Sequence, residues 1–249
     1  MSGPARVSLE PAWILHRRPY RDTSLILELL TVQHGRVPAV ARGARGPRSR
    51  RGGSLEPFRP LLVSWSGRGE MVTLTGAEPR GPSRVARGVR LMSMFYVNEL
   101  LLRLTERHDP HPDLFADYER ALAGLSGPAD ERATLRIFEK RLLAALGYGL
   151  NLETEAGSGE AVREERVYEY RLESGPVRLA PGGDAARAIP GSSLLALAAE
   201  RLEGPDALRH ARELLGAALD LYLGGRRLRS REVLRAMRAR TATGRLLAE

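Results

Sequence analysis

The stretch GRVPAVARGARGPRSRRGGS, residues 35–54, changes character halfway along its length. Residues 37–41 are short and apolar, as in a β-strand, and the glycine, proline and serine residues after them predict a loop. The stretch contains no acidic residue but six arginines: Arg36, Arg42, Arg45, Arg48, Arg50 and Arg51. Guanidinium groups match phosphate oxygens in a two-pronged geometry, so such a loop suits a nucleic-acid backbone. A solvated charge run would have the same composition, and the flanking sequence must decide between the two.

The flanking sequence predicts more short strands. Apolar segments occur at residues 13–16, 24–30, 61–65 and 71–75, and turn signals such as Arg18-Pro19 and His34-Gly35 separate them. In the second segment Leu25, Leu27 and Leu29 share one face. Five short strands with one long basic connection predict a small closed barrel over residues 1–80, with the OB-fold as first candidate. An SH3-like barrel would give nearly the same pattern.

After residue 80 the hydrophobic period becomes helical. Helices are expected at about 91–104, 113–125, 130–146, 192–202 and 206–223, with Asp206 as an N-cap of the fifth, and Ser230 is expected to cap a last short helix. Residues 151–190 lose this period and predict a small insertion, with a hairpin formed by residues 166–172 and 176–179. The predicted fold class is therefore α+β, with an N-terminal OB barrel at 1–80 and a helical domain at 81–249.

The positive charge is concentrated at the start of the chain. The net charge is +9, and residues 1–82 hold 13 arginines against 6 acidic residues. This favours a polyanion such as nucleic acid as the partner of the barrel. The chain has no cysteine, no apolar run long enough to span a membrane and no signal-peptide layout at its start. We therefore expect a cytoplasmic protein.

No catalytic motif is present. The chain lacks a phosphate-binding GxxxxGK[ST] loop, a GxGxxG turn, HExxH and GxSxG. The pair His108 and His111 is separated by Asp109 and Pro110, which prevents a shared helical face, so we expect no metal site there. Asn98 lies within the apolar stripe of a helix and is expected to be a hydrogen-bonded core amide. A binding protein without enzymatic activity or a cofactor is the better prediction.

Two further groups of cations are candidate binding sites. Arginines recur between residues 226 and 245, and the first four are Arg226, Arg227, Arg229 and Arg231. These could extend a nucleic-acid track from the barrel. In the helix at 130–146, Arg132, Arg136 and Lys140 are spaced i, i+4, i+8 and would form a basic ridge beside an apolar stripe. Such a ridge could hold an acidic, apolar peptide, although an ordinary solvated helix face has the same pattern.

The chain resembles the bacterial RecO family of recombination and repair proteins over nearly its whole length. The resemblance rests on the blocks LHRRPYRDTSLILELLT (15–31), HGRVPAVARGAR (34–45), LEPFRPLLVSWSGRGE (55–70), YVNELLLRL (96–104), LRIFEKRLLAALGYGLN (135–151) and YLGGRRLRSRE (222–232). It implies an N-terminal OB-fold, a helical C-terminal domain and no covalent catalysis.

The resemblance also implies a function and partners. Family members bind single- and double-stranded DNA, anneal complementary strands and act with RecR, and RecF, to load RecA onto DNA covered by single-stranded-DNA-binding protein. They recognise the acidic, phenylalanine-ended tail of that protein, and Arg136 falls where the family's tail-binding arginine would lie. Many relatives have a four-cysteine zinc module after the GYG block. Residues 152–167 occupy that place here without a cysteine, so we expect no zinc and a hairpin held by packing alone.

The sequence therefore predicts a DNA repair and recombination mediator that works at the nucleoid. An RNA-binding or ribosome-associated OB protein is the alternative that barrel and charge alone would permit. It predicts a preference for structured RNA and no affinity for the acidic tail.

Overall fold

The computed structural model describes residues 6–46, 55–180, 184 and 188–246. The chain forms two compact units, each described here by itself. The first consists of Met1–Pro128 together with Leu228–Glu249, and the second of Ala129–Arg227. The first unit therefore includes residues 81–128 and 228–249, which the predicted boundary at residue 80 assigned to the helical domain.

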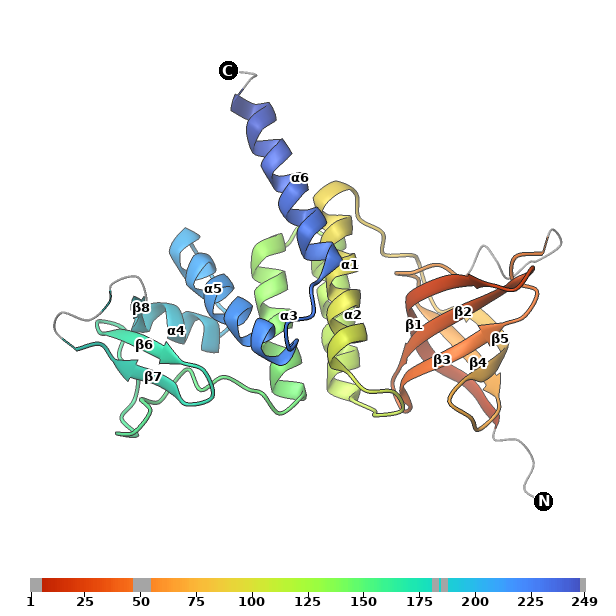
Figure 1. Cartoon of the computed structure of the whole chain (residues 1–249), viewed down its shortest axis with the longest axis horizontal. Coiled ribbons are helices and arrows are strands. Elements are labelled where there is room, and N and C mark those ends of the chain that lie inside the picture. Colours follow the sequence, from red (N-terminus) through yellow and green to blue (C-terminus); the bar gives the residue numbers. More distant parts are fainter. Residues whose placement is uncertain (1–5, 47–54, 181–183, 185–187, 247–249) are drawn as a thin grey trace. The chain divides into compact units, whose positions relative to one another are not determined.

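The first unit contains a closed five-stranded barrel (Figure 1). Its strands are β1 (Arg6–Tyr20), β2 (Ser24–Thr31), β3 (Gly35–Ala41), β4 (Leu61–Ser66) and β5 (Val72–Pro79). The strand order is β1-β2-β3-β5-β4, with β1 also paired to β4 and with β3 and β5 parallel. This connectivity is that of the OB-fold, so the predicted fold is confirmed.

Alternating side chains fill the barrel. Leu25, Leu27 and Leu29 of β2 lie in its core, as the sequence predicts. Ala44 and Leu55 also belong to this core and are 3% and 0% exposed. These two residues, on either side of residues 45–54 in the sequence, are therefore both anchored in the barrel core.

The turn expected at Arg18-Pro19 is wrong. β1 continues through both residues, and Tyr20 pairs with Ser24, so the chain turns at residues 21–23. Proline lacks an N–H donor but is tolerated near the end of a strand. The strand is therefore longer than predicted and carries Arg17 and Arg18 along its exposed end.

Three helices complete the first unit (Figure 1): α1 (Gly88–Leu104), α2 (Pro112–Ser126) and α6 (Arg229–Leu246). Asn98 of α1 is 2% exposed. Its Nδ2 donates to the Leu15 carbonyl at 2.8 Å, and its Oδ1 accepts from the Tyr118 hydroxyl at 2.8 Å. The predicted role of Asn98 as a buried, hydrogen-bonded amide is confirmed, and it joins the barrel to α1 and α2.

The start of α6 differs from the prediction. The helix begins at Arg229 rather than after a Ser230 cap and has 18 residues rather than a short run. The Glu99 carboxylate accepts from the backbone N–H groups of Arg229 at 3.1 Å and Ser230 at 2.9 Å, and from the Ser230 hydroxyl at 2.6 Å. A carboxylate from a distant helix therefore satisfies the free N–H groups that a local side chain was expected to cap.

The second unit contains α3 (Glu131–Ala145), α4 (Gly191–Ala198) and α5 (Pro205–Tyr222) with a small sheet. The sheet has the order β7-β6-β8 and consists of β6 (Val167–Arg171), β7 (Gly175–Arg178) and β8 (Ala188–Pro190). The hairpin was predicted, but β8 was missed because three residues show no period. The N-cap of α5 is Gly204 rather than Asp206, which lies in the first turn.

A polar cluster holds the insertion to the hairpin, so the expectation of packing alone is wrong. The Glu155 carboxylate, with a side chain 4% exposed, accepts from Arg166 at 3.2 Å, from Arg178 at 3.1 Å and from the buried Tyr168 hydroxyl at 3.2 Å. Glu160 pairs with the same arginines, at 3.4 and 2.9 Å. Opposite charges thus neutralise both carboxylates.

Candidate nucleic-acid interface

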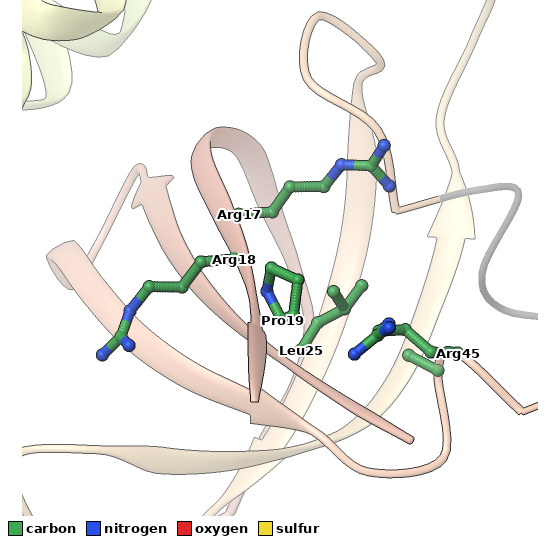
Figure 2. A pocket seen from close by; sticks show the side chains of 6 residues that line it. Arg17, Arg18, Pro19, Leu25 and Arg45 are labelled. Carbon is green, nitrogen blue, oxygen red and sulfur yellow. The ribbon is translucent and has the colours of Figure 1, made fainter. Parts of the chain in front are cut away.

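A pocket opens on the barrel where β1, β2 and the end of β3 meet. Its volume is about 280 Å³, and it is lined by Arg17, Arg18, Pro19, Leu25, Ala44 and Arg45 (Figure 2). Three lining residues are cationic and the other three are apolar. A pocket with arginines around an apolar floor suits an anion that also has a flat, apolar part.

Backbone contacts hold the Arg45 side of the pocket in place. The Arg45 N–H donates to the Thr23 carbonyl at 2.7 Å and so ties this segment to the turn between β1 and β2. The neighbouring Ala44 side chain lies in the barrel core. Arg45 therefore starts from a fixed point, which lowers the conformational entropy that binding would cost.

The three arginines differ in their contacts. The Arg17 guanidinium pairs with Glu56 at 2.7 Å and donates to the Leu55 carbonyl at 3.2 Å. Within the described part of the chain, the exposed side chains of Arg18 and Arg45 have no ion pair or hydrogen bond. In Figure 2 Arg18 extends to one side of Pro19 and Leu25, and Arg45 lies on the other. Arg17 is thus neutralised, whereas Arg18 and Arg45 can accept an external anion.

The predicted loop arginines fall into three groups. Arg42 and Arg45 are exposed at the end of β3. Arg48, Arg50 and Arg51 lie outside the described residues. Arg36 is largely enclosed, with a side chain 13% exposed that pairs with Glu28 at 3.1 Å and donates to the Thr105 carbonyl at 2.8 Å.

The contacts of Arg36 indicate a structural role. Burial lowers the pKa of its guanidinium, the Glu28 carboxylate acts against this effect, and nearby Arg107 adds to it. Glu28 also pairs with Arg107. Because Arg36 holds β2, β3 and the end of α1 together, we leave it out of the proposed DNA-binding surface.

The aromatic residues around the loop lie mostly inside the protein. Trp13, Phe58 and Trp65 are 1%, 2% and 4% exposed, and Trp13 packs edge-on against Tyr118 at a centroid distance of 5.7 Å. Buried rings cannot stack on bases. Tyr20, next to Pro19 in β1, is half-buried, so arginines and the apolar pocket floor are the main groups that this face offers to a ligand.

Comparisons with known proteins agree with this architecture. The family model described as "Recombination protein O N terminal" matches residues 7–82, and "Recombination protein O C terminal" matches residues 86–232. The chain is 48% identical over 233 residues to "DNA repair protein RecO" of Methylococcus capsulatus, covering 94% of this chain and 95% of the relative. It is 52% identical over 244 residues to the protein of the same name in Alkalilimnicola ehrlichii, covering 97% and 95%.

The chain belongs to the RecO family. The match extends over both compact units, since the C-terminal model alone runs from α1 to the start of α6. The resemblance drawn from the sequence blocks is thereby confirmed. The positions that bind DNA or partners in this RecO-family chain are not settled by these matches and stay predictions.

Sequence reasoning missed two pocket residues of this RecO-family chain. Arg18 was treated as part of the Arg18-Pro19 turn signal, and Arg17 beside it was not considered. The exposed pair shares the pocket with Arg45, which lies 27 residues further along. Two adjacent arginines at the end of an otherwise apolar strand were the available signal, but only closure of the barrel places them beside Arg45.

The C-terminal arginines of the RecO-family chain are divided between the units. Arg226 and Arg227 end the second unit, and Arg229 and Arg231 lie in the first turn of α6. Arg226, Arg227 and Arg229 are exposed, and Arg231 is half-buried. Their role in a nucleic-acid track stays a prediction.

The three cations on α3 have different environments. Arg132 is exposed. Arg136, with a side chain 13% exposed, pairs with the buried Glu139 at 2.5 Å. Lys140 donates to the Ala198 carbonyl at 2.7 Å and pairs with Glu200 at 3.0 Å, so it stabilises the C-terminal end of α4. Of the three, Arg132 alone is exposed to solvent.

Metal binding has no candidate in the described part of the RecO-family chain. Among these residues, no group of three or more His, Asp or Glu side chains could hold a metal ion. The insertion at 152–167 contains no cysteine, and two of its five glutamates, Glu155 and Glu160, are already paired with Arg166 and Arg178. These residues do not fit a zinc ion. Within the described residues, no helix is both long and apolar enough to cross a membrane.

Proposed function

We propose that this chain is a DNA repair and recombination mediator that binds DNA through its barrel. The observation that carries the proposal is the three-arginine pocket on an OB-fold in a chain of the RecO family. Arg18, Arg42 and Arg45 are exposed on this face. Phosphate contacts by arginine provide affinity without sequence preference, which suits a protein that must act on any damaged sequence.

The mediator role has several steps. The chain binds single- and double-stranded DNA, anneals complementary strands and, with RecR, helps RecA load onto DNA covered by single-stranded-DNA-binding protein, with RecF as an indirect partner. Binding and positioning of strands suffice for these steps, so no covalent bond needs to be made or broken. Support comes from family membership and from the absence of catalytic motifs in the sequence.

We place the docking site for the tail of single-stranded-DNA-binding protein on α3. The Arg136 guanidinium has five N–H donors and can bind a carboxylate of the tail while it keeps its contact with Glu139. Arg132, exposed one turn earlier, adds a second positive charge.

The test combines binding and annealing. A fluorescent single strand is titrated with the full chain over a range of salt concentrations, and annealing of two complementary strands is followed in parallel. If about four phosphates are contacted, log K falls with log salt at a slope of roughly −3. Absence of binding and of accelerated annealing would refute the proposal.

The RNA-binding alternative predicts tighter binding to structured RNA than to single-stranded DNA. No observation on the barrel favours RNA, and the relatives named above are DNA repair proteins. The same titration with a hairpin RNA of equal length separates the two functions.

A further inference from the structure

The pocket on the barrel combines features that a duplex backbone alone would not need. A contact with phosphate requires cations on an open surface, but here Pro19, Leu25 and Ala44 form an apolar floor between cations. Leu25 and Ala44 are 6% and 3% exposed, so the floor is firmly packed into the barrel. The apolar floor therefore needs an explanation beyond phosphate binding.

We propose that the pocket holds one unpaired nucleotide of a DNA strand, with its base against this floor and the neighbouring phosphates on Arg18 and Arg45. The proposal rests on the proposed function and deepens it, since it names the part of the ligand that enters the pocket. The volume of about 280 Å³ suits a single nucleotide rather than a paired segment.

The directions of the arginines support this arrangement. Figure 2 shows Arg18 and Arg45 on opposite sides of Pro19 and Leu25, so they do not converge on one phosphate. Successive phosphates of a strand lie on either side of the nucleotide between them. Two cations separated by an apolar floor therefore match a base flanked by two phosphates.

The contacts of Arg17 indicate a different role for that residue. Its guanidinium is held by the Glu56 carboxylate at 2.7 Å and the Leu55 carbonyl at 3.2 Å. This pairing leaves Arg17 less available to a second anion than Arg18 and Arg45 are. Arg17 thus acts as a wall of the pocket, and Arg18 and Arg45 are the residues that contact phosphate.

A nucleotide in this pocket must have left its base pair. In a duplex each base is stacked and paired, and its removal costs a few kcal/mol, whereas a single strand offers bases at little cost. The pocket therefore contributes affinity for single strands that it does not contribute for duplexes. This gives the barrel a physical means of preferring unpaired DNA, although its arginines bind both forms.

The experiment uses the full chain with matched variants. Arg18→Ala/Arg45→Ala removes the two phosphate contacts, and Arg6→Ala/Arg68→Ala is the control. Arg6 and Arg68 are exposed arginines of the same barrel that do not line the pocket. Both variants lower the net charge equally. Binding of an oligothymidine of about 20 nucleotides and of a duplex of the same length is measured over a range of salt.

The expected result is specific to the pocket and to single strands. The pocket variant reduces the steepness of the salt dependence for oligothymidine by about 1.4, because each contacted phosphate contributes about 0.7. The control changes it less, and the duplex is affected less than the single strand. Equal effects of the two variants, or equal losses for duplex and single strand, would overturn the proposal.

A second comparison tests the base contact. Wild type is expected to bind oligothymidine about three- to tenfold more tightly than an abasic oligomer of the same length, since the abasic strand has phosphates but no bases. Pro19→Ala should reduce this ratio. An unchanged ratio in Pro19→Ala would show that the base does not contact the pocket floor. If wild type binds no DNA at all, the proposed function itself fails, which is a separate outcome.

Discussion

The buried hydrogen bond between Tyr118 and Asn98 provides a quantitative test of how the barrel and helices are joined. Tyr118 is 0% exposed and donates from its hydroxyl to Asn98 Oδ1 at 2.8 Å, and Asn98 Nδ2 donates to Leu15 of β1 at 2.8 Å. Burial raises the pKa of Tyr118 far above its ordinary value, so the hydroxyl stays protonated and donates at every working pH. Tyr118→Phe deletes this donor with little change in shape.

The expected loss of stability follows from the polar groups that each substitution leaves without a hydrogen-bond partner. In Tyr118→Phe one buried acceptor loses its donor, which costs about 1 to 2 kcal/mol. Asn98→Leu leaves both the Leu15 carbonyl and the Tyr118 hydroxyl without a hydrogen-bond partner, and we expect it to lower the free energy of unfolding by about 2 to 4 kcal/mol. The double variant should cost about 1 kcal/mol less than the sum, because both single changes remove the same bond.

The assay is urea unfolding followed by tryptophan fluorescence. Both tryptophans, Trp13 and Trp65, lie in the barrel, so their signal reports on the barrel although the substitutions lie on α1 and α2. In thermal melts run in parallel with the same signal, the midpoint should fall by about 2–4 °C per kcal/mol. Tyr148→Phe is the control, because that residue is 43% exposed and lies outside the first unit. A barrel transition unaltered by Tyr118→Phe would refute the inferred coupling.

Two further predictions concern the second unit. Burial by itself would raise the pKa of Glu155, but hydrogen bonds from Arg178, Ser158 and Tyr168 outweigh it and lower the pKa. The ionised Glu155 therefore stabilises the fold above the ordinary pKa of a glutamate, and this stabilisation is lost as the pH falls through the lowered pKa. Glu155→Gln should remove this pH dependence of the melting temperature between neutral pH and about pH 3. Identical pH profiles of wild type and variant would contradict the prediction. For tail docking, Arg136→Ala should weaken binding of an acidic peptide ending in phenylalanine by about tenfold, as expected for loss of a charge-assisted contact. Arg201→Ala removes an exposed arginine outside α3 and should leave the affinity unchanged. Peptide binding that survives Arg136→Ala would show that the docking site lies elsewhere.

Local pattern was sufficient for most of the architecture. Alternation in residues 24–31 placed Leu25, Leu27 and Leu29 on one face, and the structure has them in the barrel core. The glycines after Leu223 ended α5 as predicted, with φ values of 58° and 78° at Gly224 and Gly225. These features depend on neighbours in the sequence, so propensity and period determine them.

Contacts between distant residues were beyond the reach of the pattern. The cap of α6 comes from Glu99, about 130 residues earlier in the chain. The strand that runs through Arg18-Pro19 is held by pairing with β2, which outweighs the local tendency of that dipeptide to turn. In each case a tertiary contact replaced the local signal that the prediction relied on.

The barrel, the helices, the concentration of arginine and the family could all be predicted from the amino-acid sequence. Which arginines are available to a ligand depends on the folded structure. Arg36 and Lys140 are bound to carboxylates and carbonyls of their own chain, whereas Arg18 and Arg45 lie on either side of an apolar floor with exposed side chains. The physical reason is that a cation's availability depends on the groups that folding brings to it, and those groups lie far away in the sequence.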